Sequence, residues 1–88
     1  MNNPGQSSDV RLSLKTQAGD NVATVLDDQL EFTKIDGGRV IEQGIPFGHK
    51  VALVPFAVGD AIKKYGVVIG HAKTKIRKGE HVHVHNIA

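Results

Sequence analysis

The sequence predicts a small all-β domain, and three observations carry that prediction. Val and Ile together number 18 against five Leu, and branched side chains favour the pleated, half-buried surface of a strand. Ten glycines punctuate the chain every few residues, which is typical of short strands joined by tight turns. No segment keeps a 3.6-residue apolar period over about 11 residues or more, so no helix is predicted.

Alternation of apolar and polar residues places strands along most of the chain. Between two of them stands Gly37-Gly38, which predicts a two-residue hairpin turn with positive φ. Residues 60–65 form too short a segment to distinguish a strand from a helical turn. The first nine residues are expected to be a disordered arm, so the domain comprises residues 10–88. The expected strands are 10–16, 22–26, 30–35, 39–43, 49–54, 66–72 and 81–86.

Length and composition exclude several classes of protein. The 88 residues suffice for one domain. The absence of cysteine excludes a disulfide framework, a thiolate zinc site and a cysteine nucleophile. No apolar run approaches the roughly 20 residues that span a bilayer. The N-terminus has neither the basic start nor the apolar stretch of a signal peptide. We therefore expect a cytoplasmic protein that does not bind membranes.

The net charge of +2 conceals an asymmetry. Residues 1–44 carry four basic and seven acidic side chains, a net −3, whereas residues 45–88 carry seven basic and two acidic ones, a net +5. Such a basic half attracts an anionic ligand or an acidic protein surface, unless its lysines are only solvated turn residues. Nucleic acid is not expected, because the four aromatic residues are not interleaved with the basic ones as a stacking platform requires.

A short motif occurs three times and predicts a recurring turn. Gly19-Asp20-Asn21-Val22, Gly59-Asp60-Ala61-Ile62 and Gly79-Glu80-His81-Val82 share the pattern Gly, acid, any residue, branched aliphatic. An apolar residue, Phe56 or Ile76, stands three positions before the second and third glycines. We expect the apolar residue to anchor one side of the turn and the branched residue to open the next strand.

The C-terminal run Gly79-Glu80-His81-Val82-His83-Val84-His85-Asn86 carries the strongest chemical signal. On a strand, His81, His83 and His85 share one face, because side chains alternate. Imidazoles two residues apart can chelate one Zn, Fe, Mn, Co or Ni ion. Three rings on one straight strand reach a single ion less easily, so two histidines plus an outside ligand are favoured. An exposed polar edge strand is the main alternative. A purification tag is a lesser one, since valines separate the histidines.

Two further segments offer polar groups beside apolar strands. His49 and Lys50 begin a strand after the tight entry Pro46-Phe47-Gly48 and are suited to orienting an anionic ligand. Lys64 precedes Tyr65, whose hydroxyl can donate a hydrogen bond or act as a weak acid. The alternatives are a charged strand end kept in water and a tyrosine that covers the edge of the core.

Together these motifs resemble the altronate/galactarate dehydratase family over about residues 11–87. The resemblance is to the N-terminal module of that family, a SAF-type domain with a β-clip fold. In some members this module is a separate small subunit, as in altronate dehydratase small subunits and the alpha subunit of sulfolactate sulfo-lyase. The motifs, in order, are Gly48-His49-Lys50-Val51-Ala52-Leu53, Lys64-Tyr65-Gly66, Ile69-Gly70-His71-Ala72 and Gly79-Glu80-His81-Val82-His83-Val84-His85-Asn86.

The resemblance implies a component of a lyase that eliminates water, or sulfite, from a hydroxylated sugar acid such as altronate or galactarate. It further implies a divalent metal, Fe²⁺ above all, shared with a large catalytic subunit or domain, without which this chain is expected to be inactive. The implied catalytic residues are His49, Lys50 and Lys64; the implied substrate-binding residues are Lys50, Lys64 and Asn86; the implied metal ligands are His81, His83 and His85.

One stretch departs from the family pattern, and two other functions stay open. Asp27-Asp28-Gln29-Leu30 stands where many members have a glycine-containing turn. The chain is alternatively a non-catalytic SAF-type module that binds a ligand or assembles with a partner. A third reading, an apo metal carrier, requires tight stoichiometric metal on the isolated chain, whereas an incomplete ligand set gives weak binding.

Overall fold

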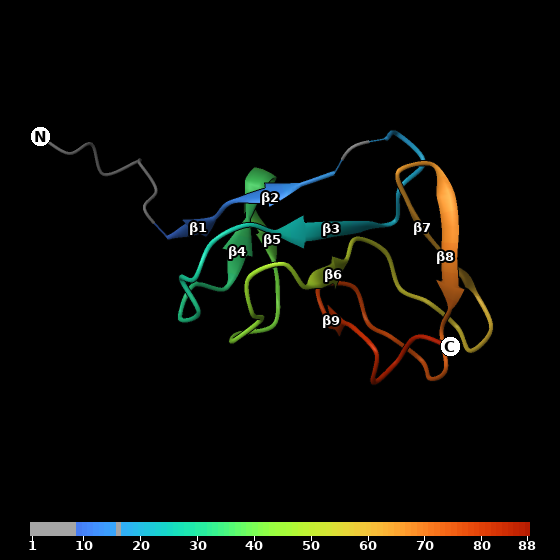
Figure 1. The fold of residues 1–88 in the computed structure, drawn as a ribbon. Coiled ribbons are helices and arrows are strands. Elements are labelled where there is room, and N and C mark those ends of the chain that lie inside the picture. The colour runs from blue at the N-terminus through green and yellow to red at the C-terminus, as the bar shows by residue number, and fades with distance from the viewer. Residues whose placement is uncertain (1–8, 16) are drawn as a thin grey trace, which may run out of the picture.

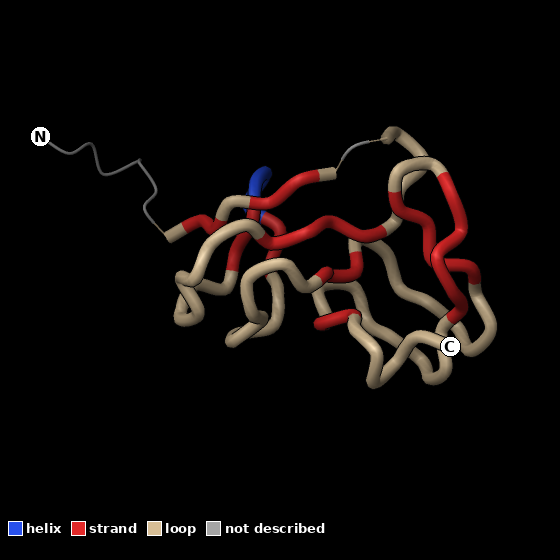
Figure 2. The backbone as a smooth tube through the Cα atoms, in the orientation of Figure 1, coloured by secondary structure: helices blue, strands red, loops and turns tan. Residues whose placement is uncertain are grey.

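The computed structural model describes residues 9–15 and 17–88, which form an almost entirely β-stranded domain (Figures 1 and 2). Within those residues lie nine short strands and one 3₁₀ turn, η1 (Asp36–Gly38). The all-β prediction is therefore confirmed. The arm predicted at residues 1–9 lies outside the described residues except for Asp9. No helix in the described ranges is long and apolar enough to cross a membrane.

The strands form three small sheets (Figure 1). The four-stranded sheet is antiparallel throughout, and in the three-stranded sheet the outer strand β1 runs parallel to β4. A separate hairpin stands at the end of the domain away from β1 (Val10–Arg11). The first sheet has the order β2 (Ser13–Leu14), β3 (Val22–Val25), β6 (Lys50–Ala52), β9 (His81–Val82); the second β1 (Val10–Arg11), β4 (Lys34–Ile35), β5 (Arg39–Val40); the hairpin is β7 (Ala61–Lys64) with β8 (Val67–His71).

Most strands are shorter than the alternation predicts, because side chains and turns replace strand partners. The expected strand 81–86 ends at Val82. Beyond it the Asn86 side chain accepts the His83 N–H at 2.9 Å, and the Asn86 N–H donates to the His83 carbonyl at 3.0 Å. Of the expected strand 10–16, residue 16 lies outside the described residues, and the part before it is divided into β1 and β2 at Leu12, whose N–H donates to the Asp27 carboxylate. Alternation thus identified the right segments but not their ends.

Two hairpins show how the local sequence sets the turns. Between β4 and β5 the connection is the three residues of η1, so the predicted two-residue turn is one residue short. Gly37 and Gly38 do have positive φ, 81° and 77°. Residues 60–65, left open above, contain strand β7, which joins β8 through Tyr65 and Gly66. Both have positive φ, 57° and 77°, as a two-residue hairpin turn requires.

Asp20 explains how Tyr65 is held in a conformation that ordinary residues seldom adopt. Its carboxylate accepts the N–H groups of Tyr65 and Gly66, both at 3.0 Å. Asp20 itself is buried. The acid of the first repeat therefore fixes a turn 45 residues further along the chain. This contact also joins the hairpin to β3, which begins two residues after Asp20.

The recurring motif forms a turn with the same reciprocal hydrogen bonds in all three copies, but of its three glycines only Gly59 and Gly79 have positive φ, so the first turn differs in backbone conformation. In each copy the acidic side chain accepts the N–H of the residue three positions earlier, and its own N–H donates to the carbonyl of that residue. The reciprocal contact is a local capping arrangement that satisfies two backbone groups in a tight turn. The pairs are Gln17 with Asp20 (3.2 and 3.1 Å), Ala57 with Asp60 (2.8 and 3.0 Å) and Arg77 with Glu80 (2.8 and 2.9 Å).

The second and third repeats also bind each other reciprocally. Phe56 and Ile76 form an antiparallel bridge with two backbone hydrogen bonds, of 2.8 and 3.0 Å. The Ala52 N–H donates to the main-chain carbonyl of Glu80 and the Ala72 N–H to that of Asp60, both at 2.9 Å. The branched residues of all three repeats meet in one buried cluster, whose members are Val22, Ala52, Phe56, Ile62, Ala72, Ile76 and Val82.

A second cluster lies against the other face of β3 and β6. Side chains alternate along a strand, so Ala23 and Val51 enter this cluster while Val22 and Ala52 enter the first. The central strands β3 and β6 are therefore buried on both faces, and the neighbouring loops are attached to them. The second cluster consists of Ala23, Val25, Ile35, Ile41, Ile45, Val51 and Leu53.

Arg11 is a fully buried cation that ties three segments together. Its guanidinium donates to the Asp27 carboxylate at 2.8 Å, to the Asp27 carbonyl at 2.6 Å and to the Ile45 carbonyl at 2.6 Å. Burial by itself raises the pKa of Asp27, but hydrogen bonds from the Leu12 N–H, Arg11 and the Gln29 N–H outweigh it and hold that pKa below its ordinary value. The departure from the family pattern at residues 27–30 thus contains the partner of a buried arginine.

We predict that Asp27→Asn lowers the free energy of unfolding by about 2–4 kcal/mol at pH 7, because it leaves the guanidinium buried without a counter-charge. This lies toward the low end for a broken buried pair, since the Asp27 side chain is 16% exposed. The lowered pKa stabilises the fold above the unfolded value of about 4, and this contribution is lost as the pH falls through the folded value. Urea unfolding between pH 3 and pH 7 measures both effects. The neighbouring exposed Asp28→Asn is the control, and equal stability of the two variants contradicts the prediction.

Candidate functional site

Four of the five histidines gather in one place, and the pairing of β6 with β9 brings them there. That pairing sets Lys50 opposite Val82 and Val51 opposite His81. One step further along the same register, His49 faces His83, and the turn after β9 carries His85. We call these four residues, His49, His81, His83 and His85, the histidine cluster. The fifth histidine, His71, is exposed at the end of β8.

The rings of the cluster are in direct contact. His49 and His83 stack face to face, with centroids 3.7 Å apart and planes 8° from parallel. The His49 Nδ1 lies 2.9 Å from the His81 Nε2, a hydrogen bond that requires a proton on one of the two nitrogens. The His85 ring lies 4.9 Å from that of His81 and is tilted by 46°. The predicted proximity of His81, His83 and His85 therefore holds, and His49 joins them.

The expected arrangement on a single strand is wrong, however. β9 ends at Val82, so His83 and His85 stand on a turn and not on a strand face. The turn folds the chain back and places His85 beside His81. Because a straight strand separates alternate side chains by about 7 Å, the turn packs the rings more closely than alternation predicts.

The surroundings favour the neutral forms of His81 and His83. Burial lowers the pKa of His81, and the charges of His85 and His49 lower it further, while Glu42 acts in the opposite direction. Burial also lowers the pKa of His83, followed by the charges of His49 and Lys50. A neutral ring keeps a lone pair for a proton or a metal. The Nδ1 atom of His83 is buried, and no described group forms a hydrogen bond with it.

Of the two predicted lysines, Lys50 lies beside the cluster, since its charge acts on His83, whereas Lys64 acts on Lys50. Lys50 follows His49 in the sequence, is the first residue of β6 and is partly buried. Burial lowers the pKa of Lys50, and the positive charge of Lys64 adds to that effect. Lys64 ends β7, with its Nζ 4.7 Å from the ring centroid of Tyr65. His49 and Lys50 are thus neighbours in sequence, and the charge effect of Lys64 on Lys50 relates them to a second part of the chain.

Asn86 holds the histidine turn in shape. Its buried side chain accepts the His83 N–H at 2.9 Å and donates to the His81 carbonyl at 2.8 Å. Both ends of the amide are therefore used within the loop. The predicted contact of Asn86 with a substrate stays a prediction, whereas its contacts with the loop are direct.

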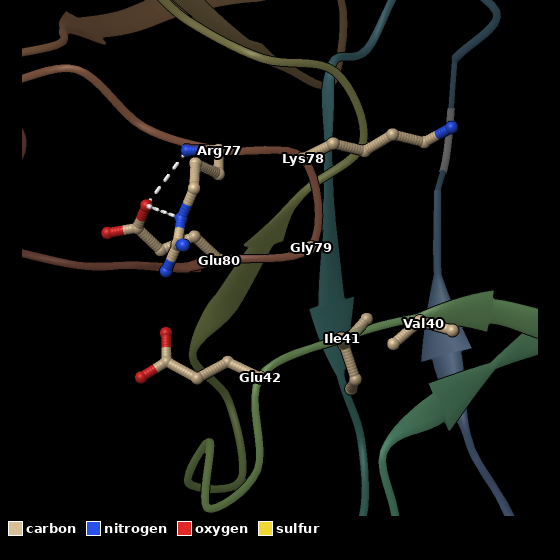
Figure 3. A pocket seen from close by; sticks show the side chains of 7 residues that line it. All are labelled: Val40, Ile41, Glu42, Arg77, Lys78, Gly79 and Glu80. Atoms are coloured by element: carbon tan, nitrogen blue, oxygen red, sulfur yellow. Dashed lines mark hydrogen bonds and ion pairs between the residues drawn. The ribbon is translucent and has the colours of Figure 1, made fainter.

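Sequence reasoning missed Glu42, which forms a hydrogen bond with the main chain of His81. Its carboxylate accepts the His81 N–H at 2.9 Å, and its own N–H donates to the Gly79 carbonyl at 2.7 Å. Figure 3 shows Glu42 and Glu80 on the same side of a cavity of about 300 Å³, with Val40 and Lys78 on the other. The acid lies inside an alternating segment, and nothing in its spacing singles it out.

Gly79 explains why the turn and Glu42 pack so closely. A Cβ built on Gly79 meets the Val40 carbonyl at 2.4 Å and the Ile41 Cα at 3.3 Å, and the φ angle is +87°. Any other residue here is both strained and in collision with backbone. The glycine of the third repeat thus allows the chain before Glu42 to reach the start of β9.

The cluster offers fewer than three convergent ligands for a metal. Across residues 9–15 and 17–88, no group of three or more His, Asp or Glu is arranged to hold an ion. Imidazole lone pairs lie in the ring plane, and the stacked planes of His49 and His83 do not meet at one point. The 2.9 Å approach of His49 to His81 offers two nitrogens. The donor set therefore fits part of a metal site, and ligation by His81, His83 and His85 stays a prediction.

Comparison with known proteins places this geometry in a family. The family model for the altronate/galactarate dehydratase SAF domain matches residues 11–88. The chain belongs to this family. The resemblance drawn from the four motifs is thereby confirmed, and so is the SAF-type fold.

Relatives of two lengths contain this SAF domain. The chain is 43% identical to the altronate dehydratase of Escherichia coli over 76 residues, covering 83% of this chain and 15% of that protein. It is 40% identical to the Bacillus subtilis altronate dehydratase, again over 15% of its length. It is 38% identical to the (2R)-sulfolactate sulfo-lyase subunit alpha of Chromohalobacter salexigens, covering 80% of this chain and 85% of that subunit. The SAF domain therefore occurs both as a small part of a long lyase chain and as nearly a whole subunit.

We predict that acid destabilises the SAF domain through its buried imidazoles. A folded pKa below the unfolded value of about 6.5 means that stability is complete above pH 6.5 and falls as the pH drops through the window below it. His83→Phe keeps a stacking ring but cannot be protonated, so its loss of stability between pH 7.5 and pH 5 is smaller. Urea unfolding in a chelating buffer measures the difference. His71→Phe, at an exposed position, is the control; a pH profile of His83→Phe parallel to that of the wild type refutes the assignment.

Proposed function

We propose that this chain is the small subunit or N-terminal domain of a metal-dependent lyase. The reaction is removal of water, or of sulfite, from a hydroxylated sugar acid or related carboxylate such as altronate, galactarate or sulfolactate. A large catalytic subunit or domain completes the active site, and the chain alone is inactive. One observation carries the proposal: four imidazoles gather beside Lys50, and the pKa values of two of them, His81 and His83, are lowered, on a domain whose relatives are named as a dehydratase and a sulfo-lyase.

The reaction needs a base, an acid and a cationic site for the carboxylate. In a β-elimination the α C–H bond breaks and its proton passes to the base, a C=C bond forms, and the β-substituent leaves. For water the departing hydroxyl takes a proton from an acid, and the resulting enol becomes a 2-keto acid. His49, whose ring contacts His81 and His83, is our candidate for the base.

The lysines divide the remaining work. The lowered pKa of Lys50 brings its ammonium closer to the neutral range, which suits proton transfer to the leaving hydroxyl. Lys64 is our candidate for binding the substrate carboxylate as a point charge. The net +5 of residues 45–88 favours approach of an anion to this half of the chain.

We assign the metal to the same cluster. His81, His83 and His85 would hold a divalent ion, iron above all, together with ligands from the large partner. When bound, the ion polarises the carboxylate and the α-hydroxyl and lowers the cost of charge developed at the α carbon. The unpartnered His83 Nδ1 supports this placement, because a buried nitrogen without a partner is otherwise costly.

A non-catalytic SAF-type module for ligand binding or assembly is the alternative. It predicts that a large dehydratase chain neither co-purifies with this protein nor gains activity from it. In that case the histidines serve a binding site of the isolated domain, and a small ligand shifts its melting temperature without turnover.

Mixing tests the proposal. The chain is combined with candidate large dehydratase subunits and ferrous iron, and sugar acids are screened for 2-keto acid production. Lys50→Met and His49→Phe should lower kcat by about 10²-fold or more, the usual contribution of general acid–base catalysis, while Lys64→Met should mainly raise KM. Lys63→Met, an exposed neighbour of Lys64, is the control. Turnover unchanged in all three site variants sinks the residue assignment.

Metal binding by the isolated chain separates this function from a metal carrier. With at most two nitrogens approaching each other, we expect the 88-residue chain to hold ferrous iron or zinc with a dissociation constant weaker than micromolar. Titration calorimetry with each metal is the measurement. Tighter stoichiometric binding by the chain alone favours the carrier.

A further inference from the structure

Strand β8 carries an apolar surface that the domain itself does not cover. Val67, Val68 and Ile69 are consecutive in the strand, and 57%, 51% and 39% of their respective surfaces are exposed. We call these three residues the β8 strip. Neighbouring residues of a strand point to opposite faces, so both faces of β8 lie open. A two-stranded hairpin is marginal in water on its own, and branched apolar residues on both faces of it indicate a covering partner.

At its C-terminal end, β8 is covered by the last residues of this chain, Ile87 and Ala88. There the His71 N–H donates to the Ala88 carbonyl at 3.1 Å and the Ala88 N–H donates to the His71 carbonyl at 2.8 Å. Ile87 packs so closely on Gly70 that a Cβ at that glycine would lie 2.4 Å from it. The chain thus covers β8 at Gly70 and His71 and leaves the β8 strip open.

The register of the hairpin favours a partner that packs on the side chains of the β8 strip over one that adds a strand to its edge. A bulge interrupts the pairing of β7 with β8 between Ile62 and Lys63, so that Gly70 pairs with Ile62 and Val68 with Lys63. Ile69 is the extra residue. Bulges twist an edge strand and discourage further strands from pairing with it, so the occupant rests on the apolar side chains.

Charge distinguishes among possible occupants. Residues 61–78 contain six basic residues and no acidic one. A second copy of this chain on the strip would set two such stretches against each other, at a cost in like-charge repulsion. An apolar surface flanked by carboxylates fits instead. The basic residues are Lys63, Lys64, Lys73, Lys75, Arg77 and Lys78.

We propose that the β8 strip is the docking surface for the large lyase polypeptide, whose facing surface is apolar and edged with Asp and Glu. The proposal rests on the function proposed above, since it names the contact by which the two parts meet. β7 of the same hairpin ends at Lys64, so a polypeptide seated on the strip lies next to a residue assigned to the substrate. Docking and substrate binding then share the β7–β8 hairpin, whose turn is held by hydrogen bonds to the Asp20 carboxylate.

Hydrogen exchange in a chimera tests the docking surface. The matched 76-residue segment of the Escherichia coli altronate dehydratase is replaced by this chain, and exchange of the Val67, Val68 and Ile69 amides is compared with that in the isolated chain. We expect exchange to slow by about tenfold or more in the chimera. The triple variant Val67→Thr, Val68→Thr, Ile69→Thr, which keeps branched side chains, should restore fast exchange. Val40→Thr, exposed on β5, is the matched control.

The outcomes are distinct. Equal exchange of the strip in chimera and isolated chain, with the rest of the domain folded, overturns the proposal. Protection of the strip in a chimera without dehydratase activity supports the docking surface and counts against the proposed function. If the chimera misfolds, sedimentation of the isolated chain decides between the two occupants. A monomer at low and high salt excludes a second copy and supports the large lyase polypeptide. A dimer that the threonine variant abolishes assigns the strip to a second copy and overturns it.

Discussion

The antiparallel pairing of β6 with β9 is the constraint on which the site depends. It joins segments about 30 residues apart and aligns Lys50 with Val82, which sets His49 against His83. The pairing is held from both sides, since Ala52 and Val82 enter one apolar cluster and Val51 enters the other. A slip of one residue would turn Val82 out of the core, so the apolar packing that stabilises the sheet also fixes the facing imidazoles.

Around this pairing the chain assembles groups that repel each other when protonated. Burial lowers the pKa values of His81, His83 and Lys50, and the charges of neighbouring basic groups lower them further. Glu42 is the carboxylate that opposes this trend at His81. The result is that the neutral forms of His81 and His83 are favoured in the half of the chain that carries a net +5. An anionic ligand that approaches it meets both features at once.

The sequence predicted the parts of this arrangement that depend on local patterns. The turn motif, the all-β class and the proximity of the C-terminal histidines follow from spacing, and the addition of His49 to them follows from the family motifs. What escaped prediction depends on contacts between distant residues. Arg11 finds Asp27 and the Ile45 carbonyl only in the folded chain, and Glu42 finds the His81 N–H across 39 positions. Strand ends escaped for the same reason, because Asn86 and Asp27 replace ladder partners with side chains.

The reciprocal bond between the second and third repeats has a kinetic consequence. Phe56 and Ile76 are only 20 positions apart, and closing a loop of that length costs little more entropy than closing one half as long. In the N-terminal half β4 and β5 form a local hairpin, but the central strand β3 needs β6, which is made later in the chain, to complete its pairing. We therefore expect the C-terminal unit to form its native contacts first and to serve as the nucleus onto which the remaining strands condense.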